Sequence, residues 1–359
     1  MNLNFRTFEQ SKSLDKQREL FIECFPETIG SSLPTEEHYQ WKFHSFPNET
    51  KSYEYEALNK DDILGYYAAI PYPYKYFGKP LTAGMVCDVM TGVKARGKGV
   101  FTKLGDYSTN EFKENGLAFS TGYPIRSEVI PGHIRVGWKL PFQIPMYGKF
   151  HRMNTFLSIR KMKLLVPFAN LFITLYNSCL RIINTSSENY DISYYSASEI
   201  ETIEGLEELI ATLQKEVSIA LDKSIKFLKW RLGAPGTDYH VIVLREKTRV
   251  IGYTVLRNVI KEGIPCIGVL DFSILDQYKK SSKILLREID RVANRSKAEL
   301  ILMMMMEDYG KKYHLYRSGY IKTPFPFSFI IKQFDQTLEE EQLHNRKNWN
   351  LMWIDSDDL

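Results

Sequence analysis

The sequence is poor in the features that mark several large classes of protein. Its 359 residues contain only four cysteines, which are widely spaced and match no zinc-binding pattern. The 47 basic residues are nearly balanced by 43 acidic ones, so the formal net charge is only +4, and the basic residues form no single run. This composition argues against a disulfide-rich secreted domain, a metal site built on cysteines and a nucleic-acid-binding protein.

The chain also lacks a clean apolar run. Its first residues, MNLNFRTFEQSKSL, are polar and contain no apolar core of signal-peptide length. The most apolar stretch, residues 164–183, is interrupted by Pro167, Asn170, Asn177, Ser178 and Arg181. We therefore expect a cytoplasmic protein without stable membrane insertion, in which this stretch is a buried connecting helix. Contact of the stretch with a membrane surface or a partner chain is the alternative.

An internal repeat determines the expected fold. Two segments share a tryptophan, a proline-marked turn, a glycine that opens a strand, an aspartate inside a later strand, and a closing glycine–aromatic pair. The first set is Trp41, Pro47, Gly65, Asp88 and Gly137-Trp138, and the second is Trp230, Pro235, Gly252, Asp271 and Gly319-Tyr320. The separation falls from 189 residues for the tryptophans to 182 for the closing pairs, as a few loop deletions would produce. We conclude that the chain is duplicated.

Each copy shows the same order of elements: a hairpin, a strand with the aspartate, an amphipathic helix and a buried strand. This order predicts an α/β protein whose two related domains each have a mixed sheet covered by helices. The expected boundaries are 1–155 for the first domain, 156–188 for the connecting helix, 189–335 for the second domain and 336–359 for an acidic tail. Trp349 and Trp353 suggest that part of this tail docks on the protein.

The strongest local signal is the segment VMTGVKARGKGVFTKLGDYS. A strand is expected to end near Val93, the residues Arg96-Gly97-Lys98-Gly99 follow, and an amphipathic helix begins directly after them. Free amides at a helix start, glycines that admit close approach and two basic side chains together favour binding of a phosphate. The segment lacks both the GK[ST] ending of a P-loop and the GxGxxG dinucleotide pattern. A glycine-rich turn with two solvated basic residues is the simpler alternative.

This strand, loop and helix resemble motif A of the GNAT acetyltransferases, in which a strand precedes Arg/Gln-x-x-Gly-x-Gly/Ala. Arg96 and Gly99 match that pattern, whereas Phe101 stands where the family has a small residue. The resemblance implies that the loop amides hold the coenzyme A pyrophosphate, that the preceding strand pairs with the pantetheine arm, and that an amide near Met90 or Thr91 stabilises the oxyanion. It also implies acetyl-CoA as co-substrate, and no metal is expected. The cofactor-binding candidates are Val89, Met90, Thr91, Val93, Arg96, Gly97, Lys98, Gly99, Val100, Phe101 and Thr102.

Candidate catalytic residues follow from the chemistry of acyl transfer to an amine. Asp88 is the candidate general base, because burial inside an apolar strand should raise its pKa, although a structural role is an equal alternative. His133 occupies the place usually held by the tyrosine that protonates the thiolate, and its ordinary pKa suits proton transfer at neutral pH. Tyr123 and Glu128 are alternatives, and Arg126 could bind an acidic group of the acceptor.

The second copy has the segment DQYKKSS, residues 276–282, in place of the glycine loop, so we expect it to be non-catalytic. The arrangement is similar to bacterial proteins with two GNAT domains that acetylate small amines. It predicts an N-acetyltransferase that transfers the acetyl group directly to a primary amine of a small molecule, such as an amino sugar, in a chain that could form a homo-oligomer. A non-catalytic protein that binds acyl-CoA or a partner, and an aminoacyl or peptidyl transferase of cell-wall type, are the alternatives.

Overall fold

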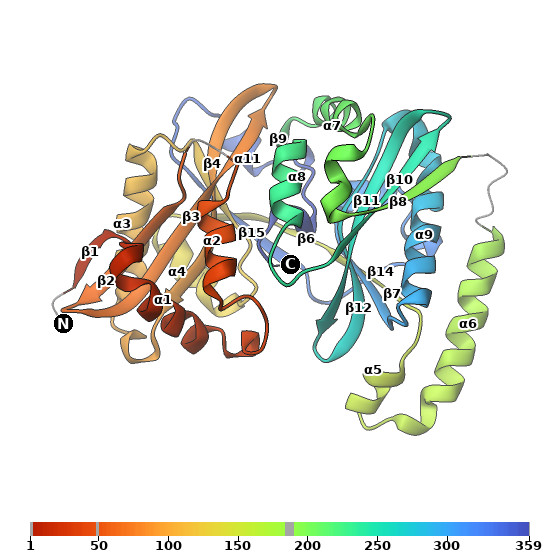
Figure 1. Ribbon diagram of the computed structural model, residues 1–359, viewed down its shortest axis with the longest axis horizontal. Coiled ribbons are helices and arrows are strands. Elements are labelled where there is room, and N and C mark those ends of the chain that lie inside the picture. The colour runs from red at the N-terminus through yellow and green to blue at the C-terminus, as the bar shows by residue number, and fades with distance from the viewer. Residues whose placement is uncertain (1–2, 48–49, 184–189, 359) are drawn as a thin grey trace. The chain divides into compact units, whose positions relative to one another are not determined.

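The computed structural model describes residues 3–47, 50–183 and 190–358. The chain forms two compact units that are each discontinuous in sequence. Unit 1 comprises residues 1–143, 218–236 and 328–348, and unit 2 comprises residues 144–217, 237–327 and 349–359. Each unit is a mixed α/β structure with a twisted sheet and helices on it (Figure 1). The predicted boundaries, which are contiguous in sequence, do not coincide with these units, because each unit includes segments from both halves of the chain.

Unit 1 is built around a sheet with the strand order β1-β2-β3-β4-β5-β15-β6, and β9 also pairs with β3. Only β4 and β5 run parallel among the pairs whose register is defined in this sheet. The strands are β1 (Asn4–Thr7), β2 (Tyr53–Asn59), β3 (Asp62–Tyr76), β4 (Lys79–Thr91), β5 (Phe119–Gly122), β6 (Lys139–Ile144), β9 (Ile219–Leu221) and β15 (Phe327–Gln333). The helices are α1 (Gln10–Cys24), α2 (Glu36–His44), α3 (Val100–Glu114), α4 (Ile130–Arg135), α8 (Ile225–Leu232) and α11 (Glu340–His344).

Unit 2 has the strand order β14-β7-β13-β12-β11-β10-β8. Its strands are β7 (Met146–Phe150), β8 (Asp191–Ser196), β10 (Tyr239–Glu246), β11 (Arg249–Lys261), β12 (Ile264–Ile274), β13 (Leu300–Met304) and β14 (Ile321–Lys322). Its helices are α5 (Asn154–Ile159), α6 (Val166–Ile183), α7 (Leu206–Lys215), α9 (Ser282–Arg295) and α10 (Glu307–Lys312). The last strand of each repeat is exchanged: β15 lies between β5 and β6, and β7 lies between β13 and β14.

The strand registers agree with the repeat read from the sequence. Gly65 pairs with Thr91 in unit 1, and Gly252 pairs with Ile274 in unit 2, so the glycines and the following strands keep the same relation. In both units the register shifts within the second strand of this pair, which marks a β-bulge. The bulge contains Asp88 in unit 1, whereas in unit 2 the extra residue is Leu270 and the neighbouring Asp271 pairs with Val255. The two sheets are therefore built to the same plan.

The two repeated tryptophans also meet within unit 1. The indole rings of Trp41 on α2 and Trp230 on α8 stack with centroids 5.1 Å apart. Trp41 Nε1 donates to the carbonyl of Trp230 (2.7 Å), and Trp230 Nε1 donates to the carbonyl of Trp41 (2.9 Å). The reciprocal bonds satisfy the indole donors of buried Trp230 and partly exposed Trp41, which explains why a tryptophan stands at this position in each repeat.

The sheet of unit 1 separates two environments, because successive residues of a strand point to opposite faces. Tyr67 belongs to the apolar core that includes Leu104 and Phe112 of α3. Its neighbour Tyr66 points to the other face, where its hydroxyl donates a hydrogen bond to Glu54 and its ring lies close to Phe43 of α2.

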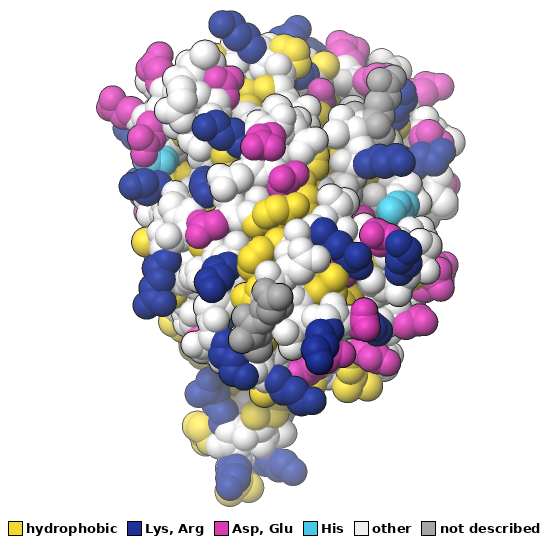
Figure 2. Space-filling model, turned by 90° about the vertical axis from the view of Figure 1, so that its left-hand side faces the viewer, with side chains coloured by type: hydrophobic (Ala, Val, Ile, Leu, Met, Phe, Trp, Pro, Cys, Tyr) yellow, Lys and Arg dark blue, Asp and Glu magenta, His cyan; other side chains and the backbone are white. Residues whose placement is uncertain are grey.

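On the side of the molecule shown in Figure 2, basic and acidic side chains are interspersed over most of the surface.

Helix α6 corrects one expectation. The apolar stretch is helical as predicted, and Lys163–Ile182 is long and apolar enough to cross a membrane by length and composition, but only 6% of that window is buried. The prediction of a buried connecting helix is therefore wrong. Cys179, which lies on this helix, is exposed, whereas the other three cysteines are buried and all four are free.

The last part of the acidic tail is buried, whereas most of residues 336–348 are exposed or partly exposed. Leu351 to Ser356 are buried in unit 2, and Trp353 packs edge-on against Phe327 with ring centroids 5.8 Å apart. The expectation that the tail docks through its tryptophans is confirmed for Trp353.

Candidate functional site

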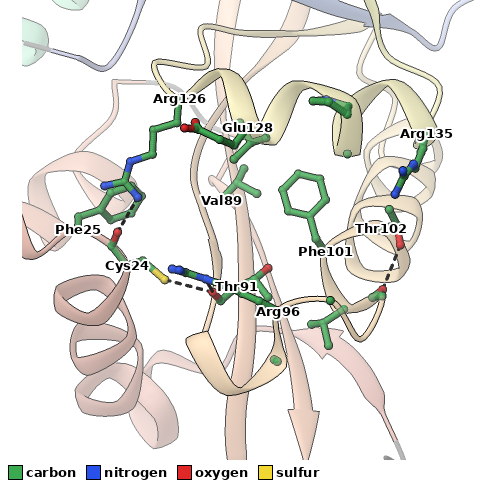
Figure 3. A pocket seen from close by; sticks show the side chains of 17 residues that line it. Cys24, Phe25, Val89, Thr91, Arg96, Phe101, Thr102, Arg126, Glu128 and Arg135 are labelled. Carbon is green, nitrogen blue, oxygen red and sulfur yellow. Dashed lines mark hydrogen bonds between the residues drawn. The ribbon is translucent and has the colours of Figure 1, made fainter.

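The glycine loop lines a cavity of about 800 Å³ in unit 1, which is within the range of small-molecule sites. The end of α1, the end of β4, the start of α3 and the segment around α4 form its walls (Figure 3). Its lining residues are Cys24, Phe25, Val89, Thr91, Ala95, Arg96, Gly97, Gly99, Val100, Phe101, Thr102, Arg126, Glu128, Val129, Pro131, Gly132 and Arg135.

One wall is the end of β4, which pairs with no described strand on the side facing β5 beyond Val86. The parallel pairing of β4 with β5 ends at Val86 and Gly122, whereas β4 continues to Thr91. Val89 and Thr91 line the cavity beyond this point. The carbonyl of Thr91 accepts hydrogen bonds from Arg96 Nε (3.3 Å) and, more weakly, from Cys24 Sγ (3.6 Å). The edge of β4 is thus left open to another extended group where the two strands diverge.

The start of α3 forms the facing wall. Gly97 and Gly99 have φ angles of 73° and 77°, which favour glycine and explain the Gly-x-Gly spacing. Gly99 is the N-cap, and no side chain among the described residues caps the helix. The amides of Val100, Phe101 and Thr102 occupy the first turn, where a helix offers donors without internal acceptors. This end of α3 is therefore suited to an anion.

Phe101, which departs from the family pattern, does not fill the site. Its ring packs edge-on against His133 with centroids 5.0 Å apart, and it lies close to the backbone of Gly132. The side chain therefore forms a wall toward α4, and the cavity in front of the helix start remains open (Figure 3).

Most of the predicted cofactor residues converge on this cavity. Those that line it are Val89, Thr91, Arg96, Gly97, Gly99, Val100, Phe101 and Thr102. Met90 is buried in the sheet, and Val93 and Lys98 are exposed but do not line the cavity. Lys98 therefore contributes less to the predicted cradle than its place in the sequence suggested.

The loop before α4 adds charge to the cavity. Arg126 lines it, but its guanidinium donates to the carbonyl of Cys24 (2.9 Å) and to Glu27 (2.7 Å), so it also ties this loop to the end of α1. Glu128 lines the cavity as well. Arg135, the last residue of α4, is a lining cation that the sequence analysis missed, since only the fold brings α4 opposite the start of α3.

His133 lies behind the cavity wall and does not line the cavity. Its imidazole is 4% exposed and packs among the rings of Phe101, Tyr67 and Trp138. Burial lowers the pKa of His133 to about 4, and its Nδ1 has no hydrogen-bond partner among the described residues. The expectation of an imidazole that titrates near neutral pH is therefore wrong. Tyr123 is also buried, against Phe329, and does not line the cavity.

Asp88 sits in the β-bulge of β4 with a φ angle of 47°. Its Oδ1 accepts a hydrogen bond from Lys42 Nζ (2.8 Å), and both side chains are less than 10% exposed. Burial alone would raise the pKa of Asp88, but the positive charges of Lys42 and Arg18 outweigh it, so the pKa lies below its usual value. The predicted rise of this pKa is wrong, because the sequence did not reveal the lysine partner on α2.

The same face of the sheet holds a carboxyl group that sequence reasoning missed. Glu54 on β2 accepts hydrogen bonds from the hydroxyls of Tyr39 and Tyr66, each at 2.6 Å, and its Oε1 lies 3.5 Å from Nε2 of half-exposed His44. Burial raises the pKa of Glu54 to about 7 against the opposing effect of the two tyrosine hydrogen bonds, and the charge of Asp88 adds to the rise. The alternation in SYEYEAL contained the signal, because it placed glutamates on one face of a strand whose two faces are both buried.

Replacement of Glu54 by glutamine should change how stability depends on pH. Because the pKa of Glu54 is about 7 when folded and about 4.3 when unfolded, the folded state binds more protons between these values. The wild-type free energy of unfolding should therefore fall, relative to that of Glu54→Gln, as the pH rises from about 4 to about 7, by about 2–3 kcal/mol. Urea unfolding at pH 5 and pH 8 measures the difference, and a constant difference across this range would contradict the buried titration.

The equivalent loop of unit 2 has lost the anion-binding features. Residues Asp276–Ser281 form a 3-10 helix that leads directly into α9, and the residue before α9 has ordinary right-handed helical angles. Asp276 is paired with Lys279 (3.6 Å) and Lys312 (3.1 Å). The loop therefore lacks the glycine turn that opens the first-turn amides of α3, and two of its neighbouring lysines are engaged by a carboxylate.

Comparison with known proteins agrees with this geometry. Residues 5–151 match the family described as acetyltransferase (GNAT) domain. No curated protein sequence matches the chain significantly. Among solved structures, a protein of unknown function from Enterococcus faecalis, described as a probable N-acyltransferase, is similar with a TM-score of 0.66 and 11% identity over 93% of this chain and 73% of that one.

Two further structures show the same fold. A GCN5-related N-acetyltransferase from Anabaena variabilis has a TM-score of 0.63 and 10% identity, over 93% of this chain and 73% of that one. A tandem GNAT protein from the clavulanic acid biosynthesis pathway has a TM-score of 0.59 and 11% identity, over 93% of this chain and 99% of that one. The family match covers residues 5–151, and the likeness to these structures shows that the chain as a whole has the fold of a tandem GNAT protein.

Proposed function

We propose that this protein is an N-acyltransferase that transfers the acetyl group of acetyl-CoA to a primary amine of a small cytoplasmic molecule. The observation that carries the proposal is the cavity of about 800 Å³, onto which the uncapped start of α3 and the open edge of β4 both face. These are the two features that a thioester with a diphosphate and an extended amide-containing arm requires.

Different residues of the cavity would bind different parts of acetyl-CoA. The first-turn amides of α3, together with Arg96 and Arg135, would hold the diphosphate. Arg96 also braces the loop, since its Nε donates to the carbonyl of Thr91. The edge at Val89 and Thr91 would align the pantetheine arm, and transfer is direct because the rate gains mainly from holding amine and thioester in attack geometry.

Proton transfer at neutral pH favours Glu54 over Asp88. Asp88 remains charged beside Lys42 and is a weak base, so we assign it a structural role: its ion pair with Lys42 links α2 to the bulge of β4. Glu54 has a pKa of about 7, near the optimum for a general base at neutral pH. Neither Glu54 nor its partner Tyr66 lines the cavity, because Tyr66 lies on β3, opposite Met90 and across β4 from the open edge. In this proposal Glu54 therefore exchanges its proton through His44, which connects the pair toward the surface.

Binding of coenzyme A is the first test. Coenzyme A at about 100 times its dissociation constant should raise the melting temperature by about 5 °C or more. Arg96→Ala combined with Arg135→Ala should remove most of this protection. The matched control is Lys279→Ala with Lys280→Ala in the corresponding loop of unit 2, which should leave the protection unchanged. Absence of protection in the wild type would overturn the proposal.

A second experiment separates catalysis from binding. The buried, neutral His133 favours a protein that binds acyl-CoA and transfers nothing, since the family's usual proton donor is missing from the cavity. Release of free thiol from acetyl-CoA should be measured over a panel of small amines, including amino sugars. Amine-dependent release supports the transferase, whereas protection by coenzyme A without release supports the binding protein.

A further inference from the structure

The segment from α5 to α6 carries a large exposed apolar face within unit 2. It contains α5, the 3-10 helix Lys163–Leu165 and α6. Leu164, Phe168 and Phe172 are 89%, 74% and 70% exposed. The face, called the α6 face below, consists of the exposed side chains Ile159, Met162, Leu164, Leu165, Phe168, Leu171, Phe172, Leu175, Tyr176 and Ile182. Large exposed apolar patches are typical of surfaces that bind another protein or a membrane.

The spacing of these residues shows that the face is one side of a regular helix. Within α6, residues 168, 171, 172, 175 and 182 each lie three, four or seven positions from another member of the set, which places them on one stripe. The other side is held to unit 2. Asn170 Oδ1 accepts from the amide of Met153 (2.9 Å), and Asn177 donates to the carbonyl of Phe150 (3.0 Å). Ile173 on that side is only 8% exposed.

Polar anchoring of one side determines how the helix can meet a bilayer. A helix that crosses a membrane as a single span would place these asparagine bonds and the strand carbonyl in hydrocarbon, which is costly. A helix fixed along one side and apolar along the other can instead lie in the plane of an interface. At 1.5 Å per residue, the 18 residues of α6 give an apolar stripe about 27 Å long.

Charge decides which partner fits this face. Residues 152–183 contain no aspartate or glutamate, but they contain Arg152, Arg160, Lys161, Lys163 and Arg181. Arg160, Lys161 and Lys163 are exposed at one end of the stripe, and Arg181 is exposed at the other. A second copy of the chain that paired its α6 face with this one would bring cations together in either direction, with no acidic residue of the segment to compensate. A surface of anionic phosphate groups over an apolar interior matches both the charge and the stripe.

We propose that the α6 face is a peripheral membrane-binding surface that recognises bilayers containing anionic phospholipids. The aromatic and aliphatic side chains enter the boundary between headgroups and acyl chains, and the lysines and arginines at the two ends contact the phosphates. This inference is independent of the proposed transferase activity.

Vesicle co-sedimentation of the full-length chain tests the proposal. Binding should be strong to vesicles of phosphatidylglycerol and phosphatidylcholine in equal parts, weak to phosphatidylcholine alone, and reduced by 0.5 M NaCl. Phe168→Ser with Phe172→Ser should weaken binding by about tenfold or more, because two large side chains no longer leave water. Ile260→Ser with Phe325→Ser is the matched control, since these residues of unit 2 are 74% and 76% exposed and lie outside the face. The control pair should not change binding.

A second pair of variants tests whether the basic residues at the end of the α6 face attract anionic lipids. Lys161→Glu with Lys163→Glu should remove the preference for phosphatidylglycerol, whereas Lys247→Glu with Lys297→Glu, at other exposed turns of unit 2, should retain it. Melting temperatures check that the variants stay folded. Equal binding to both kinds of vesicle, an equal loss in the control pairs, or a dimer in light scattering that only Phe168→Ser with Phe172→Ser abolishes would overturn the proposal.

Discussion

Replacing Lys42 by methionine is expected to lower the free energy of unfolding of unit 1 by about 3–5 kcal/mol. Lys42 Nζ lies 2.8 Å from Oδ1 of Asp88, and both side chains are buried between α2 and the bulge of β4. Methionine preserves the length and apolar stem of lysine, so the variant removes the charge and little else. Asp88 then has to stay charged without its nearest cation or take up a proton, and either state costs stability. Urea unfolding, with hydrogen exchange of α2 and β4 to locate the change, measures the effect.

The control is the neutral pair Lys42→Met with Asp88→Asn. Because it removes both charges, it should recover most of the lost stability, and the cycle of single and double variants then gives the coupling energy. The pKa of Asp88 is lowered in the folded state, so its contribution is present above its unfolded pKa of about 3.9 and is lost as the pH falls through the folded value. A loss below about 1 kcal/mol in Lys42→Met, or no recovery in the pair, would show that the contact contributes little.

Asp88 also shows why the fold was more predictable than the chemistry. A carboxylate in an apolar strand is visible in sequence, and the repeat correctly places such a residue in the corresponding strand of each unit, beside a bulge. The direction of its pKa depends on Lys42, which lies 46 residues away on a helix that crosses the strand, and no local pattern reports such a pair. In unit 2 the matching Asp271 accepts from the hydroxyl of Tyr253 instead, so even the repeat does not transfer the partner.

Sequence patterns predicted a feature correctly when a single continuous segment of the chain forms it. Gly97 and Gly99 were expected to admit close approach at a helix start, and they do place the start of α3 on a cavity, with positive φ angles. Arg135 and Glu54 were missed because each becomes relevant only through a neighbour supplied by the fold. The exchange of β7 and β15 between the sheets was also not predicted, since the choice of sheet for a short strand depends on the rest of the fold.

The exposure of α6 has a similar origin. Apolar periodicity indicates a helix with one side to be covered, and within a single chain the usual cover is the protein's own core. Here the polar residues that seemed to interrupt the apolar run, Asn170 and Asn177, are the ones that hold the helix to unit 2. The apolar side is consequently the one that remains open.

Thr102→Asp is expected to separate stability from cofactor binding, with opposite signs for the two. Thr102 is in the first turn of α3, lines the cavity and is partly exposed, and its hydroxyl donates to the carbonyl of Gly99 (3.1 Å). A carboxylate in the first turn interacts favourably with the helix dipole, so the free energy of unfolding should stay the same or rise by about 0.5 kcal/mol. The same charge should repel a diphosphate held by the neighbouring amides and weaken coenzyme A binding by about a hundredfold, from a Coulomb repulsion of about 1–4 kcal/mol.

Isothermal titration with coenzyme A and urea unfolding of the same samples give both quantities. Thr102→Asn is the matched control, because asparagine has nearly the shape of aspartate without its charge, and it should bind coenzyme A within about threefold of the wild type. The carboxylate of Asp106, one turn further along α3, is present in the wild type and in both variants, so it does not contribute to the difference between them. If Thr102→Asp and Thr102→Asn bound coenzyme A equally well, the diphosphate would lie elsewhere, and the start of α3 would have to be regarded as a structural turn. If only the aspartate variant lost binding while its unfolding remained unchanged, the charge at this helix start would be the determinant, because no loss of folding could account for the difference.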